Sequence, residues 1–274
     1  MPCELECIPS CLCKAVSTAV NQFRPPLNPD ESAALTRLVL AYCLGRGSIC
    51  LCSRSYSLQL HQPKAHGDYT HYQWRRLRQF LPAIKEPRYH PTGDGSGETG
   101  QWRLRVSSLY FETAYRLLYP DGFRLSSSVL ELLGSEAIAT LWADRGRVLM
   151  GRGAVHCNGR LNLSRFQPEE AELINEWIYR LTGAEGRLQA APRPPHGPLL
   201  SYDSPATEVL IASLGSTWHA QAPCLERKFR RPDRRGQQPT GVRAERLRQA
   251  GRRRAVLQRR PGRSVPVLKT PEVA

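Results

Sequence analysis

Apolar residues follow two spacings along the chain, helical and extended, in an order that occurs twice. The first half predicts a helix at 29–44, strands at 48–52 and 56–61, a helix at 68–80, two strands around a polar loop at 92–100, and a helix at 109–118. The second half predicts a helix from 135 to about 144, strands at 147–150 and 160–163, a helix at 168–181, strands at 187–190 and 199–202, and a helix at 205–214. Each half therefore predicts the order αββαββα.

The boundaries of the first helix are marked clearly. Asn28 can cap it, Pro29 suits the first helical position, and Glu31 completes a capping box. Gly47 follows its end, as Gly146 follows the helix in the second half.

The two helix ends lie 99 residues apart, counted from residue 46 to residue 145, which indicates an internal duplication. We predict an α+β fold of two pseudo-symmetric repeats with antiparallel sheets. The predicted organisation is a leader, a first repeat, a second repeat and a basic tail, at 1–27, 28–120, 121–216 and 217–274. The leader and the tail are predicted to be disordered.

Charge changes the interpretation of the tail. The chain of 274 residues has a formal net charge of +15. Residues 225–274 hold 16 Lys and Arg against 4 acids, a net of +12, which leaves +3 for residues 1–224. Such a block is typical of an arm that binds polyanions, and the alternative is a solvated tail without a specific role.

The sequence argues against a membrane protein and against a secreted protein held by disulfides. No stretch of about 20 apolar residues could span a bilayer, and the first residues lack the features of a signal peptide. The nine cysteines, an odd number, are expected to be reduced, as in an intracellular protein. The cluster of Cys3, Cys7, Cys11 and Cys13 could ligate a metal, but it matches the spacing of zinc ligands only in part, and we assign no metal site.

Two short segments carry a family resemblance. The sequence AYCLGRGSI at 41–49 resembles the first signature helix of the LAGLIDADG homing endonucleases, and LWADRG at 141–146 resembles the second. The segments at 56–60, 66–69, 102–105, 117–120 and 165–173 are similar to the family as well, so the resemblance covers about 29–214.

The resemblance implies a saddle of two antiparallel sheets that lies in the DNA major groove, with the two signature helices side by side at its centre. Small residues would allow those helices to approach closely: Ala34, Ala41, Gly45, Ala139 and Ala143. In active members the acid before the last glycine of each motif binds a divalent metal, and Mg²⁺ is the cofactor that the family implies.

Both acids are replaced here, by Arg46 and Arg145. A hard divalent cation needs oxygen ligands, and a guanidinium offers donors and a fixed positive charge instead. Asp144, the residue before Arg145, is a weak substitute because one helical step turns its side chain by about 100°. We therefore expect no bound Mg²⁺ and no cleavage, with the arginines contacting phosphates. The alternative is purely structural, since glycine and a cation both favour a helix end.

Candidate nucleic-acid-binding residues lie on the strands that follow each motif. Arginine, asparagine and glutamine pair with base edges, and the alternative is an ordinary solvated sheet face. The candidates are Arg54, Ser57, Gln59, His61, Arg103 and Arg105 in the first half, and Arg147, His156, Asn158, Arg160, Asn162 and Arg187 in the second.

The sequence thus predicts a monomeric protein that binds double-stranded DNA and does not cut it. Two alternatives stay open. One is a splicing helper that binds structured intron RNA, and the other is an active endonuclease with displaced metal ligands.

Overall fold

The computed structural model describes residues 26–91, 100–150, 157–189, 197–214, 223–225 and 228. All of them belong to the first of two compact units, Met1–Arg231, and the second unit, Pro232–Ala274, lies outside the described residues. The cysteine cluster of the leader and nearly all of the basic tail lie outside them as well.

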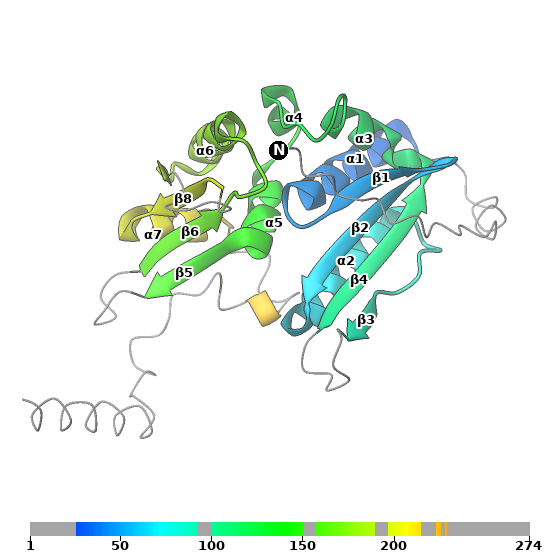
Figure 1. The fold of residues 1–274 in the computed structure, drawn as a ribbon, viewed down its shortest axis with the longest axis horizontal. Coiled ribbons are helices and arrows are strands. Elements are labelled where there is room, and N and C mark those ends of the chain that lie inside the picture. Colours follow the sequence, from blue (N-terminus) through cyan, green and yellow to red (C-terminus); the bar gives the residue numbers. More distant parts are fainter. Residues whose placement is uncertain are drawn as a thin grey trace, which may run out of the picture. The chain divides into compact units, whose positions relative to one another are not determined.

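Each half contains the predicted αββαββα order (Figure 1). The first half consists of α1 (Pro29–Leu44), β1 (Ser48–Cys52), β2 (Ser55–Pro63), α2 (Gly67–Phe80), β3 (Arg88–Pro91), β4 (Gly100–Ser108) and α3 (Glu112–Leu118). The second consists of α5 (Ser135–Arg145), β5 (Gly146–Met150), β6 (Cys157–Asn162), α6 (Pro168–Thr182), β7 (Arg187–Gln189), β8 (Leu199–Tyr202) and α7 (Ser204–Leu214).

Three short elements were not predicted: the helix α4 (Ser127–Glu131) and the 3-10 turns η2 (Lys64–His66) and η4 (Pro223–Leu225). The helix predicted at 109–118 begins as a 3-10 turn, η3 (Leu109–Phe111), and continues as α3. Elements of three to five residues are too short to show a hydrophobic period in the sequence.

The two sheets have the same topology. The first has the strand order β1-β2-β4-β3 and the second β5-β6-β8-β7, with every pair antiparallel. An identical order in both halves confirms the predicted duplication and the α+β fold.

Capping explains where the long helices begin. The Asn28 side chain accepts from the Glu31 N–H at 2.8 Å, and the Glu31 carboxylate accepts from the Asn28 N–H at 3.1 Å, so the predicted capping box is present. Gln167 and Glu170 form the equivalent box at the start of α6, and Gly183 ends that helix with φ of 73°, a conformation that favours glycine.

One face of each sheet contributes to the core. Leu58 and Leu60 of β2 and Leu104 of β4 are buried, as are Leu161 of β6 and Leu200 of β8. Each buried leucine contributes about 2 kcal/mol of hydrophobic stabilisation. The helices cover these faces, so the alternate positions of the strands point away from them.

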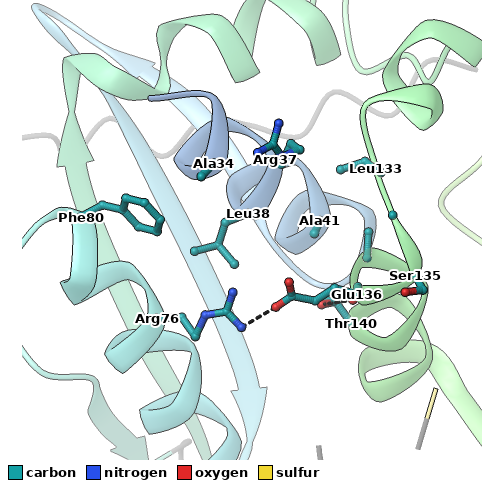
Figure 2. Close-up of a pocket in the computed structure, with 12 residues that line it drawn as sticks. Ala34, Arg37, Leu38, Ala41, Arg76, Phe80, Leu133, Ser135, Glu136 and Thr140 are labelled. Atoms are coloured by element: carbon teal, nitrogen blue, oxygen red, sulfur yellow. Dashed lines mark hydrogen bonds and ion pairs between the residues drawn. The ribbon is translucent and has the colours of Figure 1, made fainter. Parts of the chain in front are cut away.

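Helices α1 and α5 pack against each other and join the two halves. A pocket of about 350 Å³ opens between the middle of α1, α2 and the first turns of α5, where Arg76 of α2 pairs with Glu136 of α5 (Figure 2). Its lining also includes Leu38 of α1 and Phe80 of α2. Arg46 follows the C-terminal end of α1, and Arg145 is the last residue of α5. Among the described residues, no helix is long and apolar enough to cross a membrane.

Candidate functional site

The two motif arginines meet where α1 and α5 end. Arg145 donates from Nε to the Gly45 carbonyl at 2.8 Å, and Arg46 donates from Nε to the Asp144 carbonyl at 3.2 Å. Gly45 and Asp144 each precede the motif arginine of their own helix. The two bonds are therefore reciprocal, and each guanidinium stabilises the carbonyl end of the opposite helix.

Asp144 is buried inside this arrangement, with 2% of its surface exposed. Its Oδ2 accepts from the Arg46 N–H at 2.9 Å, and its Oδ1 accepts from Nε2 of Gln62 at 2.6 Å. Burial raises the pKa of the carboxyl, and the donors Gln62 and Arg46 oppose that rise.

Gly45 leaves the space that the carboxylate fills. A Cβ placed on Gly45 would lie 1.9 Å from Oδ2 of Asp144. The two repeats are thus asymmetric at their centre, with a carboxylate in one and a bare backbone at the equivalent position of the other.

Positive charge exceeds negative charge at this centre. Burial and the nearby cations Arg165 and Arg46 together lower the pKa of Arg145 to about 10, although Asp144 opposes the fall. Lys228, from the segment after the second repeat, interacts with both Asp144 and Arg46. Three cations therefore act on one carboxylate, with Arg165 next to Arg145, and this excess of positive charge favours the binding of an anion.

Arg165 holds the backbone at the end of α1. Its Nη1 donates to the carbonyls of Cys43, Gly45 and Gly47 at 2.7, 3.3 and 3.1 Å, and its guanidinium lies 4.3 Å from the ring centroid of Phe123. It caps α1 from the opposite repeat. Sequence reasoning did not single out Arg165, Gln62 or Lys228, because each reaches the site through a contact between distant parts of the chain.

The residues at the helix ends do not fit a divalent metal. Both oxygens of Asp144 are already hydrogen-bonded, and the equivalent position is Gly45. Within the part of the chain that the structure describes, no group of three or more His, Cys, Asp or Glu residues could hold a metal ion. The adjacent guanidiniums repel a dication and offer it no oxygen.

The outward face of the first sheet contains the candidates that sequence analysis named there. The register aligns His61 with Arg103 and Arg103 with Arg88, and it aligns Gln59 with Arg105. His61, Arg103 and Arg105 are exposed. Burial lowers the pKa of His61, as do the neighbouring cations Arg103 and His90.

Ser57 lies on the same face but is fully buried, and its Oγ accepts from Nε of Arg105 at 3.0 Å. It therefore positions Arg105 rather than forming part of the surface. Arg54 is exposed in the turn between β1 and β2.

The second sheet has a matching row. Arg147 of β5 pairs with Arg160 of β6, Arg160 pairs with Ser201 of β8, and Ser201 pairs with Arg187 of β7. Asn158 and Asn162 are exposed at alternate positions on either side of Arg160, on the same face. His156 lies outside the described residues.

Acids are absent from all eight described strands, which contain six arginines. Like charges directly opposite each other destabilise a sheet, so rows of arginine without a compensating acid are an energetic cost to the isolated fold. A bound polyanion would remove that cost.

Comparison with known proteins supports the fold. No family model matches the sequence, and no curated protein is detectably similar to it. The structure resembles that of the homing endonuclease I-WcaI bound to its DNA recognition sequence, with a TM-score of 0.58 and 12% sequence identity over 76% of this chain and 96% of that one. At this identity the likeness establishes a shared fold, which confirms the fold expected from the signature segments.

Two further structures resemble this one less closely. The complex of I-DmoI with DNA and Mn has a TM-score of 0.41 and 14% identity, and it covers 68% of this chain and 98% of that one. The LAGLIDADG homing endonuclease I-GzeII in complex with its DNA target has a TM-score of 0.38 and 10% identity, and it covers 81% of this chain and 90% of that one.

Proposed function

We propose that this protein belongs to the LAGLIDADG homing endonuclease family and binds double-stranded DNA without cleaving it. The observation that carries the proposal is the pair of acid-free sheets, each with a cross-strand row of cations on the face turned away from the helices. Because the same chain supplies both repeats, we expect it to act as a monomer, and its cysteines favour a reducing, intracellular location.

The chemistry of the two faces suits a duplex. Arginine pairs bidentately with guanine, and asparagine and glutamine pair with adenine in the major groove, which is wide enough for a two-stranded ribbon. Gln59, Asn158 and Asn162 thus supply base-reading groups, between arginines that can neutralise the flanking phosphates. The shared fold with a DNA-bound homing endonuclease supports the same reading.

The helix ends support binding in preference to hydrolysis. Arg46 and Arg145 stand where the family resemblance implies the metal-binding acids. Asp144 is held by Gln62 and by the Arg46 backbone N–H. Without oxygen ligands there is no site for the Mg²⁺ that the family implies, and phosphodiester hydrolysis has no metal to activate water. Charge-assisted bonds from the two guanidiniums to a phosphate are the chemistry that remains.

The test of binding begins with selection of preferred sites from a random duplex library, followed by fluorescence anisotropy over a range of KCl concentrations. Arg147→Gln and Arg187→Gln are each expected to weaken binding and to reduce the salt slope by about 0.9 for each phosphate contact removed. Arg180→Gln removes the same charge from the exposed surface of α6 and serves as the matched control. Equal effects of all three substitutions would contradict the proposal.

Two further measurements separate the alternatives. Structured RNA that displaces duplex DNA at moderate salt would favour the splicing role. Mg²⁺-dependent cutting of a selected site, lost in Asp144→Ala, would favour an active endonuclease. We expect neither result. We expect the protein to bind its selected DNA site and to leave both strands uncut.

A further inference from the structure

The segment after the second repeat returns to the arginine pair. Its turn η4 packs against α2, and Leu225 within it is 1% exposed and belongs to the core. Trp142, buried in α5, donates from Nε1 to the Lys228 carbonyl at 2.9 Å. A buried apolar side chain and a satisfied indole N–H therefore fix the backbone on both sides of residues 226–227.

The side chain of Lys228 enters the site. Its ammonium donates to the Ala143 carbonyl in the last turn of α5. The charges that face it are Asp144 of α5 and Arg46, which follows the end of α1, with His66 of η2 and the Cys224 thiol also nearby.

A role as a cap for the end of α5 would explain the hydrogen bond from Lys228 to Ala143. It would not explain why the Lys228 ammonium lies near another cation, Arg46. An ammonium has three donors, and Ala143 takes one. Burial and the charge of Arg46 together lower the pKa of Lys228 to about 8, although Asp144 opposes the fall. A half-buried cation next to other cations is costly to the free protein, and an anion placed between them would stabilise all of them.

We propose that Lys228 completes a three-cation phosphate site with Arg46 and Arg145, and that docking of η4 is what delivers it. The ligand class is a phosphodiester of a nucleic-acid backbone. The inference rests on the proposed function, because it assigns to the same centre a residue from outside both repeats.

The first test compares Lys228→Gln and Lys228→Arg in the full chain, with Lys85→Gln as the control for loss of one exposed lysine charge. Anisotropy with a mixed-sequence duplex is measured between 50 and 200 mM KCl. We expect Lys228→Gln to weaken binding about five- to tenfold near 0.1 M salt and to lower the salt slope by about 0.9, with Lys228→Arg retaining both. Thermal melting of each variant identifies any loss of folding.

The second test measures the titration of Lys228 in the wild-type chain and uses a variant only to assign its signal. The chain has five lysines, so ¹³C-dimethylation, which preserves their charge, gives few methyl signals to assign by NMR. We expect one lysine to titrate near pH 8, to be absent from the spectrum of Lys228→Gln, and to titrate at higher pH when duplex is added, because a bound phosphate stabilises the ammonium.

The outcomes are separable. If the wild-type chain fails to bind duplex, the proposed function itself fails. If it binds, but Lys228→Gln equals Lys85→Gln and the Lys228 titration does not move, the inference is wrong while the proposed function stands. Tighter binding by Lys228→Gln would also overturn it, because it would show that the segment blocks the site.

Discussion

The substitution Gly45→Ala tests the asymmetric centre most directly. A Cβ at residue 45 would lie 1.9 Å from Oδ2 and 2.8 Å from Cγ of Asp144, so the carboxylate must move. It cannot move freely, because the Arg46 N–H and the Gln62 amide hold it at 2.9 and 2.6 Å. Overpacking costs about 1–3 kcal/mol, and a lost hydrogen bond to a charged group costs about 1.5–3 kcal/mol. We therefore expect Gly45→Ala to lower the free energy of unfolding by about 3–5 kcal/mol.

The substitution Asp144→Ala removes the carboxylate that blocks a Cβ at residue 45. Asp144→Ala loses two hydrogen bonds but also a desolvated charge, so its own cost is about 1–3 kcal/mol. In that background the new Cβ would meet the Cβ of residue 144 at 3.1 Å, which a shift of a few tenths of an ångström relieves. Gly45→Ala should then cost about 1 kcal/mol, which corresponds to a coupling energy of about 2–4 kcal/mol.

Urea unfolding of the four chains, followed by circular dichroism and tryptophan fluorescence, measures the cycle. Gly134→Ser is the matched control, because a Cβ there meets nothing within 4 Å and serine is a good helix N-cap. The reasoning is refuted if Gly45→Ala is as mild as Gly134→Ser, or if it costs the same with and without the Asp144 carboxylate.

Three further predictions concern pH, capping and metal binding. Burial and nearby cations lower the pKa of His66 from 6.5 to about 4, so unfolding takes up a proton in this range and stability falls as the pH drops from 6.5 to 4. Because the ring is half-buried, we expect the free energy of unfolding to fall by about 1–2 kcal/mol over this pH range. Urea midpoints measured across the range should show this fall in the wild-type chain and not in His66→Gln. Arg165→Met should cost about 2–4 kcal/mol because three carbonyls at the end of α1 lose their donor, whereas Arg180→Met, on an exposed face, should change the urea midpoint little. The double variant Arg46→Asp with Arg145→Asp should gain Mn²⁺ binding in calorimetry, since it supplies carboxylates beside Asp144; absence of heat would show that the remaining cations alone exclude the ion.

The sequence predicted the fold well, because local signals determine it. The capping box at Asn28, the glycine after α6 and the alternating strands each act within a few residues, and the duplication repeated the pattern twice. Strand lengths were less accurate. The strand predicted at 56–61 is β2 and extends to Pro63, and the strand predicted at 160–163 is β6 and begins at Cys157. Pairing with a neighbouring strand, rather than propensity, sets where a strand ends.

The site was predicted only in part. The motif positions identified Arg46 and Arg145, but not what holds them. Gln62 and Lys228 reach Asp144 or its helix across more than 80 residues of sequence, and Arg165 reaches α1 across about 120. Such contacts leave no periodic trace in one sequence, so only the assembled helix pair shows them.

The reciprocal arginine bonds make it difficult to build a metal site at this centre one substitution at a time. Each guanidinium neutralises the carbonyl end of the helix opposite its own. A single reversion to aspartate would put a negative charge against that negative end while the other arginine still repels the metal, so it would lose helix stability and gain no chemistry. The two arginines therefore depend on each other, and exchanging them one at a time for acids passes through a less stable protein.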